Sequence, residues 1–152
     1  MKFEIVRASR TGFCFGVKRA VDIVVKAAAE HGRIETLGAV VHNPQVMTKL
    51  GQNGVEVVKN IEDIKGKIVI TSSHGVNPEI EEKIKARGIE IIGTRCGNVR
   101  RAQVVAKRLA DAGFFVVVFG DANHPEVKGI MGWISNKGIA TTNINDVDAL
   151  NP

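Results

Sequence analysis

Two cysteines, Cys14 and Cys96, are the residues of this sequence with the most distinctive chemistry. Each lies next to glycine or one residue from it, and directly before a segment with a helical pattern. A helix N-terminus favours a thiolate over a thiol, and thiolates bind zinc or iron–sulfur clusters. Since disulfides are rare in the cytosol, the two residues are free thiols, metal ligands, a catalytic residue or inert buried cysteines.

Three of the four histidines, His42, His74 and His124, lie in loops close to a proline. An imidazole beside a helix N-terminus suits a diphosphate, because the ring and the backbone N–H groups both donate to phosphate oxygens. A zinc site is the rival interpretation, but the usual metal-binding spacings of histidine are absent. His31 falls at the end of a predicted helix, where a cation favours the helix dipole, and we interpret it as structural.

Glu126 lies two residues after His124, which places a carboxyl group where it can donate a proton. The alternative is an ordinary glutamate in the first turn of a helix, favoured by the dipole. Ser72 and Ser73 precede His74 and are either phosphate donors or plain polar residues at a strand end. The glycines match neither dinucleotide-binding nor Walker A spacing, so nucleotide binding has no support.

The elements that position these residues alternate between strand and helix patterns. Apolar residues recurring at i, i+3 and i+4 predict a helix over 16–31. Proline after asparagine or histidine predicts helix starts at 44, 78 and 125. Further predicted elements are a helix over 98–112, a last turn over 146–150, and strands over 3–8, 34–37, 55–58, 67–71, 89–92, 114–119 and 139–142. The alternation predicts an α/β fold with mainly parallel sheets flanked by helices.

In open parallel sheets, ligands bind beyond the carboxyl ends of the strands. The cysteine and histidine loops all follow predicted strands, so we expect them to converge on one site. The loops are those of Cys14, His42, His74, Cys96 and His124.

Composition narrows the class of partner. The chain has 152 residues, 44% of them hydrophobic, enough for one domain or two small ones with a core. Its net charge of +5 suits an anionic partner: nucleic acid, a phosphorylated metabolite or an acidic protein. Only 5% of residues are aromatic and none is tyrosine, which disfavours nucleic-acid recognition. The sequence lacks a signal peptide and a membrane-length apolar run, so we expect a cytoplasmic protein without membrane contact.

Four motifs together resemble one family, the 4-hydroxy-3-methylbut-2-enyl diphosphate reductases (LytB or IspH) of the non-mevalonate isoprenoid pathway. The resemblance runs from Phe3 to about Leu150, in the family's order and spacing. The motifs are Gly-Phe-Cys-Phe-Gly-Val-Lys-Arg-Ala at 12–20, Val-His-Asn-Pro-Gln-Val at 41–46, Ser-His-Gly-Val at 73–76 and His-Pro-Glu-Val-x-Gly-x-x-Gly at 124–132.

The resemblance implies an oxidoreductase with a [4Fe–4S] cluster held by three cysteines, one iron being open to substrate. It implies reductive removal of an allylic hydroxyl to give isopentenyl and dimethylallyl diphosphate, with ferredoxin or flavodoxin as electron donor. Carried onto this chain, Cys14 and Cys96 match two cluster ligands and Glu126 matches the proton-delivering acid. The residues that match substrate-binding histidines are His42, His74 and His124.

This chain departs from the family at one motif and in length. The family usually has Asp and Pro flanking its second cysteine, whereas here the stretch 93–98 reads Gly-Thr-Arg-Cys-Gly-Asn. The family has three similar α/β domains. The resemblance therefore implies a first domain over 1–95 with Cys14, His42 and His74, and an incomplete second over 96–152 with Cys96, His124 and Glu126. The resemblance also implies that the family's third domain, with the third cysteine and a Ser-Asn group for the diphosphate, is missing from this sequence.

Two alternatives stay open on the sequence. One is an inactive short relative, or a diphosphate- or cluster-binding module that needs a partner chain. The partner would be a missing C-terminal half or a second copy sharing a cluster. The other is an unrelated basic α/β protein that binds nucleic acid or phosphate. Tight, strongly salt-dependent binding to DNA or RNA would support it.

Overall fold

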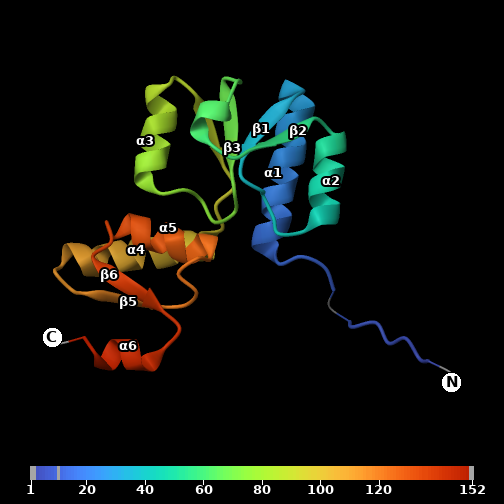
Figure 1. Cartoon of the computed structure of the whole chain (residues 1–152). Helices are drawn as coiled ribbons and strands as arrows, with labels where there is room; N and C mark the ends of the chain where they lie inside the picture. Colours follow the sequence, from blue (N-terminus) through green and yellow to red (C-terminus); the bar gives the residue numbers. More distant parts are fainter. Residues whose placement is uncertain (1–2, 10, 151–152) are drawn as a thin grey trace.

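The larger sheet contains four parallel strands in the order β2-β1-β3-β4 (Figure 1). The computed structural model describes residues 3–9 and 11–150. The strands are β1 (Ile34–Leu37), β2 (Val55–Val58), β3 (Ile68–Thr71) and β4 (Glu90–Gly93). The prediction of a parallel α/β sheet is confirmed.

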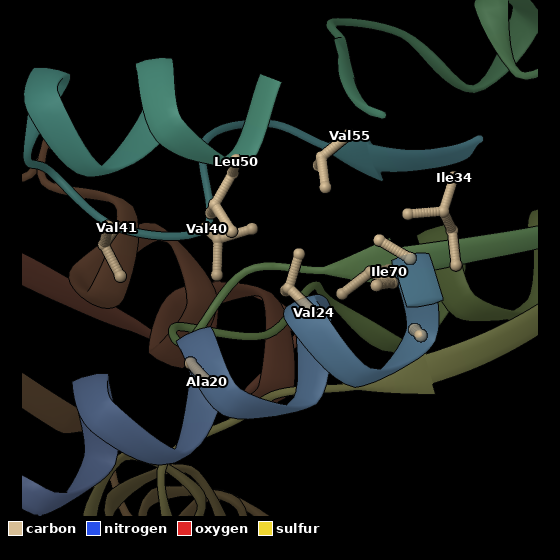
Figure 2. Packing of buried hydrophobic residues seen from close by; sticks show 10 residues of the cluster. Ala20, Val24, Ile34, Val40, Val41, Leu50, Val55 and Ile70 are labelled. Carbon is tan, nitrogen blue, oxygen red and sulfur yellow. The ribbon is translucent and has the colours of Figure 1, made fainter. Parts of the chain in front are cut away.

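Helices cover both faces of this sheet. They are α1 (Phe15–His31), α2 (Pro44–Gln52) and α3 (Pro78–Ala86). On one face, Val24 of α1 and Leu50 of α2 share a core with Ile70 of β3 (Figure 2). On the other face, Ile84 of α3 packs with Val69. Successive residues of β3 thus enter opposite cores, because side chains alternate along a strand.

Local capping explains where these helices begin. The Asn43 side chain accepts a hydrogen bond from the Val46 N–H at 3.0 Å, and the Asn77 side chain accepts one from the Ile80 N–H at 2.8 Å. Each asparagine satisfies an N–H that the first turn leaves free, and proline follows it at the first helical position. The predicted helix starts are confirmed.

A second, smaller sheet pairs β5 (Val116–Phe119) with β6 (Gly138–Thr141) in parallel. One face packs on helices α4 (Gly97–Asp111) and α5 (Pro125–Trp133) around a core that includes Val116 and Ile134. The opposite face is open, since Val117 and Phe119 are 38% and 69% exposed. A short helix, α6 (Ile144–Asp148), and a 3-10 turn, η1 (Ile61–Asp63), complete the elements.

The predicted strand over 3–8 is wrong. Residues 3–9 form no strand, and Phe3, Ile5 and Val6 are 87%, 95% and 79% exposed. Figure 1 shows this segment running away from both sheets. A strand needs a neighbour to satisfy its N–H and C=O groups, and neither described sheet lies beside this one.

The predicted strand over 114–119 begins two residues late, at Val116. The Phe114 N–H instead donates to the Leu109 carbonyl at 3.0 Å, so the end of α4 holds it.

Within residues 3–9 and 11–150, no helix has the length and apolar character needed to cross a bilayer.

Candidate active site

Both cysteines stand at helix N-termini. Cys14 is the N-cap of α1 and Cys96 the N-cap of α4, each with extended backbone angles. Both are free thiols; Cys14 is exposed and Cys96 half-buried. The Cys96 N–H donates to the Ser73 carbonyl at 2.9 Å, which ties this loop to the loop that carries His74.

The first turn of α1 lies directly against Cys96. A Cβ atom added at Gly16 would lie 2.7 Å from the Cys96 Sγ, too close for any side chain. The Arg19 guanidinium also donates to the Arg95 carbonyl at 3.3 Å. The structure therefore brings the Cys96 loop against the helix that Cys14 caps, although the two cysteines are distant in sequence.

The donor set suits part of an iron–sulfur cluster. Two thiols at adjoining helix N-termini, with glycine beside them, offer soft ligands and room for a bulky group. In the part of the chain that the structure describes, no group of three or more His, Cys, Asp or Glu side chains could hold a metal ion. Cys14 and Cys96 thus have the chemistry of two soft ligands for such a cluster.

The three loop histidines lie together. The ring centroids of His42 and His74 are 5.2 Å apart, those of His74 and His124 are 5.7 Å apart, and those of His42 and His124 are 6.3 Å apart. His42 precedes the cap of α2, His74 follows β3, and His124 caps α5. Their convergence agrees with their predicted places after strands.

The hydrogen bonding of His124 sets which nitrogen can donate. Its Nδ1 accepts the Glu126 N–H at 3.2 Å, so the neutral ring carries its proton on Nε2. The backbone N–H of Glu126 is thereby satisfied at the start of α5. No hydrogen bond within residues 3–9 and 11–150 uses Nε2, which leaves that N–H group as a donor to an anion.

Electrostatics favours the neutral form of the central histidine. Burial lowers the pKa of His74, and the neighbouring His42 and, to a lesser degree, His124 lower it further, while Glu126 opposes the shift. A bound anion would act in the same direction as Glu126 and draw a proton onto this cluster of rings.

Gln103 is a site neighbour that sequence reasoning missed. It is fully buried on α4, and its side-chain amide donates to the His74 carbonyl at 3.2 Å. Gly129 of α5 lies against the same amide, with an added Cβ 3.0 Å from Nε2. One sequence feature could have identified it: Gln103 lies on the same face of the predicted helix as the apolar residues Val99 and Ala106.

The cavities of the molecule are only partly related to this cluster. One of about 310 Å³ is lined by His42, Asn43 and Pro44, among others. A larger one of about 510 Å³ is lined by His31, Arg33 and Lys65 and lies at the opposite, amino ends of β1 and β3. His31 is exposed in the last turn of α1, as expected for a structural residue there.

Comparison with known proteins points to one family. The sequence matches the family profile described as LytB protein over residues 5–152. A 4-hydroxy-3-methylbut-2-enyl diphosphate reductase of Dehalococcoides mccartyi (strain ATCC BAA-2266 / KCTC 15142 / 195) is 60% identical over 143 residues, covering 94% of this chain and 50% of that protein. The corresponding reductase of Geobacter sulfurreducens is 46% identical, over 86% of this chain and 46% of that protein.

Solved structures agree. The E-1-hydroxy-2-methyl-but-2-enyl-4-diphosphate reductase of Plasmodium falciparum superposes with a TM-score of 0.90 at 30% identity, covering 95% of this chain and 46% of that one. A structure of (E)-4-hydroxy-3-methyl-but-2-enyl diphosphate reductase, described as the terminal enzyme of the non-mevalonate pathway, gives 0.81 at 37% identity, over 95% and 53%. The chain thus spans about half the length of the relatives it matches.

Proposed function

This chain belongs to the LytB protein family, and we propose that it acts in a 4-hydroxy-3-methylbut-2-enyl diphosphate reductase. The observation that carries the proposal is the convergence of three histidines from separate loops, with ring centroids 5.2 to 6.3 Å apart. Such a group of donors suits a diphosphate. The activity of the relatives, 4-hydroxy-3-methylbut-2-enyl diphosphate reductases, supplies the substrate class.

The proposed reaction removes the allylic hydroxyl of the substrate. The C–O bond breaks, the oxygen leaves as water, and two electrons and two protons are taken up to give isopentenyl or dimethylallyl diphosphate. A [4Fe–4S] cluster, when bound, would supply the electrons and a Lewis-acidic iron for the hydroxyl oxygen. Cys14 and Cys96 are the proposed ligands on this chain.

The described side chains have separate roles in this proposal. His42, His74 and His124 hold the diphosphate; the Nε2–H of His124 is already free to donate. Glu126 donates a proton, either to the oxygen that departs as water or to the carbon skeleton that it leaves. The Glu126 N–H donates to the His124 ring, whose centroid lies 5.7 Å from that of His74, and this supports placing the acid beside the diphosphate site.

Basic residues near the cysteines favour an acidic electron donor. Lys18 and Arg19 are exposed in α1 soon after Cys14, and Arg100 and Arg101 are exposed in α4 after Cys96. Cations beside the two cysteines would steer an acidic protein toward the site at which electrons enter. Ferredoxin or flavodoxin is the proposed donor, and a cytoplasmic location suits two reduced thiols.

We propose a division into a first domain over 1–95 and a second over 96–152. Two separate sheets and separate cores support it. The relatives are about twice as long, and the third cluster cysteine is proposed to lie in the part of them that this chain does not match. That part could be supplied by the same polypeptide, a partner chain or, for a shared cluster, a second copy.

The test is anaerobic reconstitution with iron and sulfide, followed by absorption and EPR spectra. We expect no stable [4Fe–4S] cluster on the 152 residues alone. We expect one, with turnover of the allylic diphosphate, when the C-terminal half of the Dehalococcoides relative is added. Cys14→Ser should abolish both. Failure of the wild-type mixture to bind a cluster or reduce substrate would refute the proposal.

A second candidate is a cluster- or diphosphate-binding module without catalysis. It is favoured by the two-thiol donor set, since clusters normally take three or four protein ligands. The same experiment separates it from the first candidate, because a module would bind pyrophosphate or a cluster but produce no isopentenyl diphosphate in any mixture.

A further inference from the structure

Arg95, the residue before Cys96, has its side chain largely inside the protein. Its side chain is only 17% exposed and pairs with the carboxylate of Glu81, which is itself 28% exposed. Glu81 lies on α3, the helix that begins just after the His74 loop. The guanidinium therefore joins the Cys96 loop to a helix that flanks the larger sheet.

The same guanidinium packs on the His74 loop. A Cβ atom added at Gly75 would collide with Arg95, lying 3.0 Å from Cδ and 3.1 Å from Cζ. Gly75 also has a φ of 71°, a conformation that residues with a Cβ rarely adopt. Because Gly75 has no side chain, the Arg95 side chain can pack directly against the backbone of the His74 loop.

Arg95 reaches the second sheet's helices as well. Its Cζ lies 5.2 Å from the ring centroid of Trp133, a cation–π distance. Trp133 ends α5, the helix whose other end carries His124 and Glu126. The neighbouring residue in that helix is also close-packed, because a Cβ at Gly132 would lie 2.6 Å from the Cβ of Asn77.

From these contacts we infer that Arg95 is a positioning residue that clamps α3, the His74 loop and α5 together. By doing so it fixes how far His42 and His74 lie from His124 and Glu126. No described contact of Arg95 is to the histidine rings themselves, so it acts through the elements that carry them. Its role in diphosphate binding rests on the proposed function; its role in spacing the rings does not.

The test compares Arg95→Met with Arg100→Met in the 152-residue chain, without iron or substrate. Arg95 and Arg100 both line a cleft of about 540 Å³. Arg100 is exposed, and within residues 3–9 and 11–150 it makes no ion pair or side-chain hydrogen bond, unlike Arg95. Both variants lose one positive charge and keep an unbranched side chain. Any difference between them therefore reports the contacts of Arg95 and not the change in charge.

Two spectroscopic readouts are expected to change in Arg95→Met alone. Trp133 is the sole tryptophan, so its emission should shift to the red and become more accessible to acrylamide. NMR of the four histidine rings should show loss of the NOE between His74 and His124. The pKa of His74 should move up towards its ordinary value as the loop becomes more exposed.

Retention of the His74–His124 NOE and of the His74 titration in Arg95→Met, at the level of Arg100→Met, would overturn the inference. A change in tryptophan emission alone would then mean that Arg95 only packs on Trp133. If Arg95→Met does not fold, Glu81→Gln tests the same clamp from its α3 side, with Glu82→Gln, one residue along and exposed, as control. Intact ring contacts in Glu81→Gln would equally refute the clamp.

Pyrophosphate binding separates this inference from the proposed function. If both hold, Arg95→Met should bind inorganic pyrophosphate at least about tenfold more weakly than Arg100→Met, since small displacements of binding groups are costly. Wild-type protein that shows the ring NOE but binds no pyrophosphate would count against the function and leave the clamp standing. Equal pyrophosphate affinity in the two variants would refute the role of the clamp in binding.

Discussion

Glu126 has a close counterpart elsewhere in the chain. Both Glu126 and Glu79 are the second residue of a helix that begins with proline, and both lie in the first turn. They differ in surroundings, because the Glu126 N–H donates to His124 of the histidine cluster, whereas Glu79 is exposed on α3. The pair separates a helix-dipole role, which they share, from an acid role, which only Glu126 has under our proposal.

Glu126→Gln should lower turnover of the completed enzyme by about 10²- to 10⁴-fold, the usual loss for a general acid. The cluster's absorption spectrum should stay unchanged, since the glutamate is not a proposed ligand. Turnover is measured with a chemical reductant so that donor docking does not limit the rate. Glu79→Gln should keep wild-type turnover. Wild-type rates in Glu126→Gln would remove its acid role.

The lowered pKa of His74 also makes a prediction about stability. Burial is the main cause, so the unfolded chain binds more protons than the folded one between the lowered value and the ordinary value of about 6.5. The free energy of unfolding should therefore fall as the pH drops below about 6.5. Well above that pH, His74 is neutral in both the folded and the unfolded chain, and its burial costs no stability through protonation.

Urea unfolding at about pH 8 and about pH 5.5 measures this loss. His74→Asn, which cannot be protonated, should lose less stability on acidification than the wild type. His31→Asn serves as control, because His31 is exposed and remote from the ring cluster. An equal acid-induced loss in wild type and His74→Asn would show that His74 does not titrate as its burial requires.

The residues with chemistry were predictable to different degrees. His42 and His74 could be placed together because they follow β1 and β3, whose carboxyl ends share one edge of the larger sheet. His124 follows β5 of the smaller sheet, and its approach to them depends on how the two sheets pack. The place of Gln103 among the apolar positions of α4 predicts its burial, but neither its partner His74 nor the contact of Trp133 with Arg95 could be predicted, because these residues are far apart in sequence. The sequence shows Arg95 directly before Cys96, but its pairing with Glu81 across the fold has no sequence signal.

At the scale of elements, local chemistry was the reliable guide. The helix starts after Asn43, Asn77 and His124 are confirmed because a capping side chain and a proline act within one turn. The strand predicted over 3–8 is wrong because alternation of residue types cannot supply a partner strand. Strands depend on distant neighbours, whereas helix starts do not.

The contact between α1 and the Cys96 loop depends on a glycine. Gly16→Ala should cost about 1–3 kcal/mol of the free energy of unfolding, because the new methyl group would lie 2.7 Å from the Cys96 Sγ. It should also displace Cys96 and raise its rate of reaction with a disulfide reagent. Urea unfolding and thiol labelling in Cys14→Ser protein measure the two effects.

Gly51→Ala is the matched control in the same Cys14→Ser protein. Gly51 is also helical, in α2, but an added Cβ meets nothing within 4 Å among the described residues. We expect no loss of stability there, and a gain of up to about 1 kcal/mol through a less flexible unfolded chain. Equal effects of the two alanines would mean that the close approach of Gly16 to Cys96 does not exist in solution.

At the scale of the whole molecule, the two sheets differ in how well they are supported. In the larger sheet, β1 and β3 have a strand on each side, and Val69 and Ile70 are fully buried. In the smaller sheet, each strand has one partner, and Phe119 is 69% exposed on the open face. A pair of strands is only marginally stable in isolation, so the smaller sheet depends on its packing against α4 and α5.

The amides of β5 and β6 should therefore exchange with deuterium at lower free energy than those of β1 and β3, by at least about 1 kcal/mol. Native-state hydrogen exchange of the 152-residue chain, read by NMR at individual amides, measures this difference. The comparison is internal, since both sheets are parallel and both are in one sample. The exchange of β5 and β6 should slow when the C-terminal half of a relative is added, if that half covers the open face around Val117 and Phe119. Equal protection of both sheets in the chain alone would mean that the interface around Arg95 and Gln103 makes the molecule one cooperative unit.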